Sequence, residues 1–265
     1  MSHPLITPEM IDRYQRDGVV LVPGLLADWV EPLRAGIAAN LAAPGPYASE
    51  NEKAGETGRF FDDYCNWERI PEFVDVVRKS SAAEAAADLM QSKSVQVFHD
   101  HVLVKEPGTS MATPWHQDGP YYFVDGKQTV SFWVPLDPVD EATLRCVAGS
   151  HLWEKEVLPT RWVSEEGFFP DEGQYMPIPD PEAEDMPIVE HAMQPGDALA
   201  FNFKVLHGAR GNRSDIQRRA FSLRLVGDDA RYVERPGRTS PPYPGHDMQP
   251  GQRLREDWFP VIWPG

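Results

Sequence analysis

His116 and Asp118 have the residue types and the spacing of a metal-ligand pair on a β-strand. They lie in the segment Thr113-Pro-Trp-His-Gln-Asp-Gly119, and side chains two residues apart in a strand point to the same side. His207, far downstream, can supply a third ligand. Two imidazoles and one carboxylate leave three positions of an octahedral ion open, which suits Fe(II) enzymes that bind a chelating cosubstrate and dioxygen. An HxD pair alone is a weak signal, so its surroundings must support it.

The segment after His207 offers a candidate carboxylate anchor. A turn-rich loop over 208–217 can return the chain so that Arg218 lies beside His207. A guanidinium there can hold the distal carboxylate of a dicarboxylate cosubstrate by two parallel hydrogen bonds. Alternation puts Arg219 on the opposite face, although a β-bulge would exchange the two arginines. A surface arginine is the alternative interpretation.

Periodicity and turn residues predict which elements position these side chains. Thr7 can cap an opening helix that starts at Pro8 and ends at Gly18, and Asp28 can cap a second helix. From Ser94 onward, β-branched and aromatic runs separated by Gly, Pro and Asp favour an antiparallel sandwich or barrel. We expect further helices over 28–42, 71–79 and 82–91, and strands over 19–22, 94–105, 129–136, 144–148, 188–193, 197–203 and 218–226.

Two of these strands have one apolar and one polar face. Thr129, Ser131 and Trp133 alternate with apolar residues in 129–136, and Arg218 and Ser222 lie opposite the apolar positions of 218–226. A half-exposed sheet would explain this pattern, with water on the polar side. The other interpretation is a polar internal cavity whose apolar outer faces pack under the N-terminal helices.

Several motifs resemble those of the phytanoyl-CoA dioxygenase family of Fe(II)- and 2-oxoglutarate-dependent oxygenases. The resemblance rests on TPWHQD, SFWVPLD, AGSH and HGARGN…RRAFS, and it extends from Tyr14 to about Asp229. It implies a mainly β fold, a double-stranded β-helix or jelly-roll, with N-terminal helices packed on one sheet. It also implies that His116, Asp118 and His207 bind Fe(II) and that Arg218 grips the C5 carboxylate of 2-oxoglutarate. By the same resemblance, Trp133 lies beside the cosubstrate and His101 lines its pocket.

The reaction that the resemblance implies is hydroxylation of a C–H bond. Dioxygen and 2-oxoglutarate are the cosubstrates, and succinate and CO2 are released. Related halogenases carry a small residue at the position of Asp118, so the aspartate favours hydroxylation. The stretch Glu141-Ala-Thr-Leu-Arg145 departs from the Glu-Asn-Gly turn of many members, which leaves the contacts of that loop open.

Residues that contact the substrate are less clearly marked. His99 and His101 share one strand face with Lys105, so they can line the pocket, and Lys105 can meet a substrate anion, although a structural role would also explain them. The acidic, proline-rich insertion at 167–187 resembles a lid, and the aromatic tail after Arg231 a packed wrap. Neither segment indicates which substrate binds.

Composition limits the partners. The formal net charge is −16, which disfavours nucleic acid and anionic membranes and makes a small metabolite a more natural substrate than a CoA ester. With only two cysteines and neither a signal peptide nor a long apolar run in this sequence, we expect reduced thiols and a cytoplasmic protein. The sequence gives no signal for oligomeric state.

We expect residues 1–265 to form one domain, with a helical part over 1–92, a jelly-roll core over 93–229 and a C-terminal wrap over 230–265. Two other functions fit a similar architecture. One is a cupin-like hydrolase or isomerase that uses Zn or Mn, and Arg218 argues against it because a hydrolase needs no dicarboxylate anchor. The other is a non-catalytic binding barrel, which the intact set of three ligands disfavours.

Overall fold

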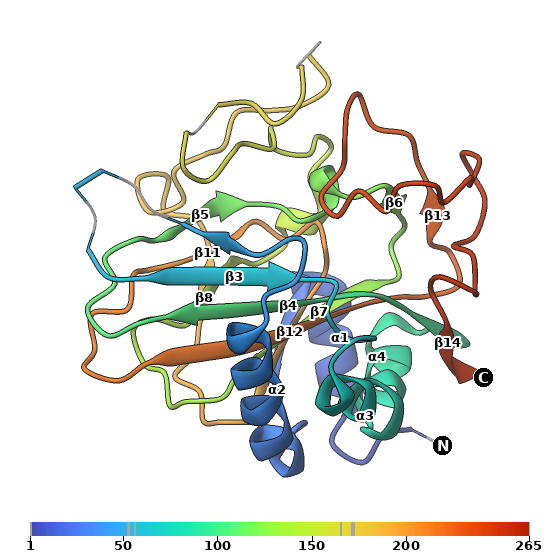
Figure 1. Ribbon diagram of the computed structural model, residues 1–265. Coiled ribbons are helices and arrows are strands. Elements are labelled where there is room, and N and C mark those ends of the chain that lie inside the picture. Colours follow the sequence, from blue (N-terminus) through green and yellow to red (C-terminus); the bar gives the residue numbers. More distant parts are fainter. Residues whose placement is uncertain (1, 52–53, 56, 165, 171–172, 265) are drawn as a thin grey trace.

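Two antiparallel sheets facing each other form the double-stranded β-helix that the sequence predicts, and helices lie beneath the larger sheet (Figure 1). The computed structural model describes every residue except 1, 52–53, 56, 165, 171–172 and 265. The larger sheet has the order β1 (Val19–Val22), β10 (Ala198–Phe201), β7 (Thr129–Pro135), β12 (Arg218–Val226), β4 (Ser94–Lys105), β3 (Phe60–Tyr64) and β2 (Ser49–Glu50), with β14 (Val261–Pro264) also on β4. The smaller sheet has the order β5 (Thr113–His116), β11 (His207–Ala209), β8 (Leu144–Val147) and β9 (Ile188–Glu190), and β6 (Val124–Asp125) pairs with β13 (Arg231–Tyr232).

The first helix has the ends that the sequence predicts. In α1 (Pro8–Asp17), the Thr7 side chain accepts a hydrogen bond from the Met10 N–H, and Gly18 ends the helix at φ 72°. The helices α3 (Pro71–Lys79) and α4 (Ala82–Met90) also match their predicted ranges within one residue.

The predicted cap of the second helix is wrong. The helix α2 (Val30–Ala42) follows a 3-10 turn over Ala27–Trp29, so Asp28 lies inside that turn. The N–H of Leu26 donates to the carbonyl of Gly196 at 2.9 Å, which holds the entry to the turn against the body of the protein. A tertiary contact of this kind is invisible to local capping rules.

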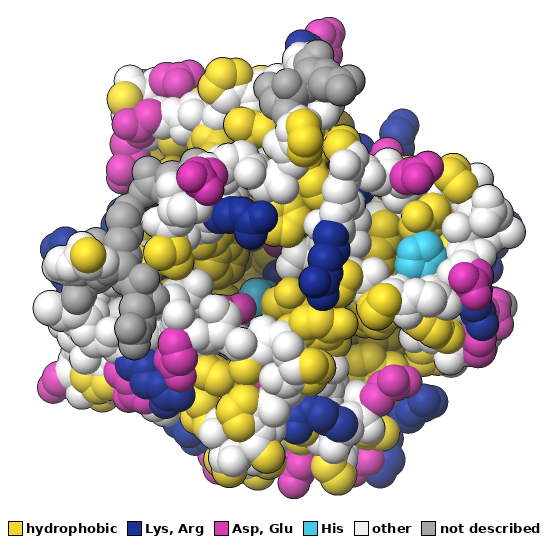
Figure 2. Space-filling model, turned by 45° about the horizontal axis from the view of Figure 1, so that its top comes forward, with side chains coloured by type: hydrophobic (Ala, Val, Ile, Leu, Met, Phe, Trp, Pro, Cys, Tyr) yellow, Lys and Arg dark blue, Asp and Glu magenta, His cyan; other side chains and the backbone are white. Residues whose placement is uncertain are grey.

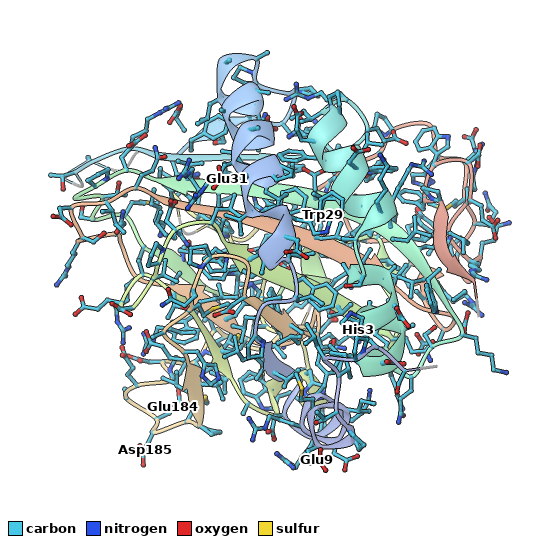
Figure 3. The ribbon with its side chains drawn as sticks, turned by 90° about the horizontal axis from the view of Figure 1, so that it is seen from below. His3, Glu9, Trp29, Glu31, Glu184 and Asp185 are labelled. Atoms are coloured by element: carbon cyan, nitrogen blue, oxygen red, sulfur yellow. The ribbon has the colours of Figure 1, made fainter. Side chains whose placement is uncertain are left out.

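The helices cover the outer face of the larger sheet and bury its apolar side chains. Seen from below, they lie across the strands, with Trp29 just before α2 (Figure 3). Phe73 of α3 packs on Phe221 of β12 with their ring centroids 4.7 Å apart. Residues of β4, β7 and β12 at alternate positions complete this core. No helix among the described residues is long and apolar enough to cross a membrane.

The opposite face of the larger sheet is polar and still buried. Ser131, Trp133, Arg218 and Ser222 all lie there with little exposure, while Arg219 lies on the other face beside Asp137. The interpretation as an internal cavity is therefore confirmed.

Both ends of the chain add strands that the sequence did not predict. β2 and β3 lie in the N-terminal part expected to be helical, and β14 joins the edge of β4. The rest of the tail packs as expected, because Met248, Leu254 and Phe259 are buried in one cluster with Phe98 and Phe123.

Candidate active site

The fold brings His116, Asp118 and His207 together although they are distant in sequence. His116 ends β5 and His207 begins β11, and the two residues are paired across these strands. One possible ligand atom from each of the three side chains lies within 4.8 Å of the others, and all three residues are buried. The Asp118 Oδ1 atom is 3.7 Å from Nε2 of His116 and 3.9 Å from Nε2 of His207.

Backbone carbonyls orient both imidazoles. Nδ1 of His116 bonds to the Pro114 carbonyl at 2.8 Å, and Nδ1 of His207 to the Val205 carbonyl at 2.9 Å. Because a carbonyl only accepts, each Nδ1 carries the proton, and the Nε2 lone pairs are left facing Asp118. Burial and the neighbouring His116 lower the pKa of His207 to about 3, so that ring stays neutral. Bare imidazole nitrogens with one carboxylate fit a divalent iron ion.

The second oxygen of Asp118 is held by an arginine. Oδ2 lies 3.2 Å from Nη2 of Arg224 and 3.4 Å from Oγ of Ser131. Burial by itself would raise the pKa of Asp118, but Arg224 and the two imidazoles lower it well below its usual range. The carboxylate is therefore ionised, with one oxygen turned toward the histidines and the other toward the guanidinium.

Arg218 lines the same cavity and has unused hydrogen-bonding capacity. It is 2% exposed, its guanidinium carbon lies 5.6 Å from the centroid of the Trp133 ring, and its Nε and Nη2 have no partner in the described part of the chain. Burial lowers its pKa to about 10, so the group is still charged at neutral pH. A buried, unpaired cation is costly, and a ligand carboxylate would satisfy it.

The remaining predicted site residues differ in how they are placed. Trp133, His101 and His99 line the cavity, and His101 Nε2 bonds to Asp62 Oδ2 at 2.9 Å. Lys105 is not among the lining residues, because its Nζ donates to the Arg210 carbonyl at 3.1 Å beneath the Phe60 ring. This geometry favours a structural role for Lys105 over the predicted contact with a substrate anion.

The cavity between the two sheets has a volume of about 440 Å³ and opens to the surface. Figure 2 shows this opening as a hollow with a histidine at its floor and basic side chains at its rim. Aromatic residues line much of it, including the stacked pair Tyr47 and Tyr64, Trp162, and Phe168 of the 167–187 insertion. The predicted role of that insertion as a lid stays a prediction.

Sequence reasoning missed two residues next to the metal-ligand set. Arg224 holds Asp118, and Tyr122 accepts a hydrogen bond from Arg224 Nε at 2.5 Å. The alternation that selected Arg218 and Ser222 also places Arg224 on the cavity face, so that signal was available. Tyr122 comes after a 3-10 turn over Gly119–Tyr121 and follows no periodic pattern.

Comparisons with known proteins agree with this geometry. A family model described as phytanoyl-CoA dioxygenase (PhyH) matches residues 14–220. Dioxygenase lolE1 of Epichloe uncinata is 29% identical over 237 residues, which cover 82% of this chain and 81% of the relative. A probable phytanoyl-CoA dioxygenase of Caenorhabditis elegans is 29% identical over 184 residues, covering 67% and 54%.

Solved structures share the fold. SnoK, described as a non-heme alpha ketoglutarate dependent carbocyclase from nogalamycin biosynthesis, has a TM-score of 0.74 at 24% identity and covers 97% of this chain and 96% of its own. EctD from S. alaskensis, solved with 2-oxoglutarate and 5-hydroxyectoine, has a TM-score of 0.68 at 18% identity and covers 96% and 88%.

Proposed function

The chain belongs to the phytanoyl-CoA dioxygenase family of iron- and 2-oxoglutarate-dependent oxygenases, and from this premise we propose that it hydroxylates a C–H bond of a small molecule. The observation that carries the proposal is one cavity that holds both the His116, Asp118 and His207 set and the unpartnered guanidinium of Arg218. A metal hydrolase would need only the first of these features.

Each residue has a defined task. His116 and His207 would hold Fe(II) through Nε2, and Asp118 through Oδ1, because their other polar atoms are already bonded within the protein. Arg218 would receive the C5 carboxylate of 2-oxoglutarate in a bidentate hydrogen bond, and Trp133 would pack beside the cosubstrate. When bound, Fe(II) supplies dioxygen reduction coupled to decarboxylation of 2-oxoglutarate to succinate. The aromatic walls would keep water from the reacting centre once the substrate fills the opening of the cavity.

The size of the cavity favours a small substrate. A volume of about 440 Å³ falls in the range of roughly 300–1,000 Å³ that is usual for small-molecule sites, and it must also hold the cosubstrate. Aromatic walls such as Tyr64, Trp162 and Phe168 suit an apolar or flat substrate body.

Succinate release tests the proposal. The protein is loaded anaerobically with Fe(II) and 2-oxoglutarate, and oxygen is then admitted across a panel of small metabolites. We expect one class to stimulate succinate formation and to gain one oxygen atom from labelled dioxygen. An epimerised or ring-closed product without added oxygen would contradict hydroxylation but not the family assignment. Failure to bind 2-oxoglutarate in the presence of Fe(II) would contradict the whole proposal.

A further inference from the structure

A second group of unpartnered polar atoms lines the cavity, away from Arg218. Nε2 of His99, Oγ of Ser222 and Nη1 of Arg224 have no hydrogen-bond partner in the described part of the chain. The three residues are 2%, 1% and 5% exposed, and all three line the cavity. His99 and Arg224 are paired directly across β4 and β12. Buried polar atoms are rarely left unpaired, so this group has the character of a binding site.

The position of the group assigns it to the substrate. Arg224 lies six residues after Arg218 on β12, which is roughly 20 Å along an extended strand. Arg224 also contacts Asp118, so this end of the strand lies beside the metal ligands. The cosubstrate carboxylate belongs at the Arg218 end. The unpartnered atoms near Arg224 are too far from Arg218 to share that carboxylate, so they remain available to the substrate.

The hydrogen-bonding roles of the group follow from its protein contacts. His99 Nδ1 bonds to the Asp100 carbonyl at 3.0 Å, so Nδ1 carries the proton. Burial, and then the positive charge of Arg224, lower the pKa of His99 well below its usual value, which keeps the ring neutral. Nε2 of His99 is consequently an acceptor. Nη1 of Arg224 is a donor, so one acceptor and one donor lie side by side on neighbouring strands of the larger sheet.

The charge of Arg224 is already balanced. Its Nη2 lies 3.2 Å from Asp118 Oδ2, and its Nε donates to the Tyr122 hydroxyl. A ligand carboxylate placed here would meet Asp118 and the lone pair of His99, both of which repel it. A neutral ligand group avoids this cost.

We propose, on the basis of the proposed function, that His99 and Arg224 select a substrate with a neutral acceptor and a neutral donor on the same carbon atom or on adjacent carbon atoms. A primary carboxamide and a hydroxy-ketone both have this arrangement. The acceptor oxygen meets Nη1 of Arg224, the donor hydrogen meets Nε2 of His99, and Ser222 can bond to either. The apolar remainder of the substrate lies among the aromatic walls of the cavity.

Three matched probes test the proposal on protein loaded anaerobically with Fe(II) and 2-oxoglutarate. They are 2-naphthamide, its methyl-ketone analogue 2-acetonaphthone, which lacks the donor, and 2-naphthoate, which is an anion. By calorimetric titration we expect the amide to bind about tenfold more tightly than the ketone, because only the amide has an N–H that can donate to Nε2 of His99. The carboxylate should bind least.

A variant distinguishes the hydrogen bond of His99 from its contribution to packing. His99→Leu should weaken the amide about tenfold, to the level of the ketone, and leave the ketone unchanged. The control His151→Leu removes a histidine outside the cavity lining and should keep the wild-type order of the probes. The order in the wild-type protein decides the matter even if His99→Leu fails to fold.

Several results would overturn the inference. They are equal binding of amide and ketone, tightest binding of the carboxylate, or no binding of the amide. The same preparation is titrated with 2-oxoglutarate before any probe is added. If 2-oxoglutarate binds but the three probes do not follow the expected order of affinity, the inference about the substrate is wrong and the proposed function still stands. If 2-oxoglutarate does not bind, the proposed function fails.

Discussion

Replacing Arg218 by methionine should move the stability of the protein and its affinity for 2-oxoglutarate in opposite directions. The ligand-free protein carries this guanidinium buried with two unpartnered nitrogens. Burial lowers the pKa of Arg218 from its usual value to about 10, which corresponds to about 3 kcal/mol against the charged form in the folded state. Arg218→Met removes that charge and keeps much of the side-chain volume. We expect the free energy of unfolding without ligands to rise by roughly 1–3 kcal/mol.

The same change removes the proposed partner of the cosubstrate. Leaving one member of a buried ion pair without its partner typically costs about 3–5 kcal/mol, which is a loss of affinity of roughly 100- to 4,000-fold. Arg218→Lys keeps a positive charge but loses the planar fork, so we expect a smaller loss of about tenfold. Calorimetric titration of 2-oxoglutarate into the anaerobic Fe(II)-loaded protein measures both values, and denaturant unfolding measures stability.

The neighbouring arginine provides a matched control. Arg219 lies on the outer face of β12, where its Nη2 is 2.5 Å from Asp137 Oδ1. Arg219→Met should lose up to about 1 kcal/mol of stability and bind 2-oxoglutarate like the wild type. The reasoning is refuted if Arg218→Met destabilises the ligand-free protein and changes the affinity for 2-oxoglutarate by less than about threefold.

Three further predictions concern the metal site, a buried acid and a helix end. Asp118→Ala should weaken Fe(II) binding by more than about 100-fold in a competition titration, because it removes a metal ligand and leaves Arg224 without its ion-pair partner. Burial raises the pKa of Asp100 to about 7, whereas an unfolded aspartate titrates near about 3.9, so between these values only the folded state holds the proton. Stability should therefore fall as pH rises from about 4 to about 7 and then level off, and Asp100→Asn should flatten this slope in denaturant titrations. Gly18→Ala should lower the free energy of unfolding by about 1–3 kcal/mol, because φ is 72° and the new Cβ would lie 2.4 Å from His151 Nδ1; an unchanged melting temperature would contradict this.

Long elements and the metal-ligand set could be predicted because their signals are local and repeated. β4 and β12 alternate over many residues, so their bounds were predicted to the residue. The HxD pair marks two of the ligands, although β5 ends at His116 and Asp118 lies in the turn that follows, at φ −69° and ψ −42°, so strand alternation is not what brings the two side chains together. The turn after His207 points to Arg218. The same alternation, together with short turns, predicts an antiparallel sandwich or barrel, and the resemblance to the family narrows this to the double-stranded β-helix.

Tertiary contacts account for what the sequence did not predict. β3 has the sequence Phe-Phe-Asp-Asp-Tyr, which lacks alternation, and it forms by pairing with β4. The carbonyls of Pro114 and Val205 that orient the imidazoles belong to the backbone, so no residue type marks them. Lys105 shares the strand face of His99 and His101, yet it lies beyond the cavity under Phe60. Periodicity gives the direction of a side chain but not what covers it.

The positions of Arg218 and Arg224 at opposite ends of β12 have a consequence for how substrate specificity can evolve. In the proposed function Arg218 binds the diacid that every turnover consumes, and in the proposed substrate site Arg224 and Ser222 contact the reactant that differs between enzymes. After a gene duplication, one copy could acquire a new specificity through changes at the second end and inherit the first end intact. One strand thus carries both a cosubstrate contact that must be kept and substrate contacts that can change during evolution.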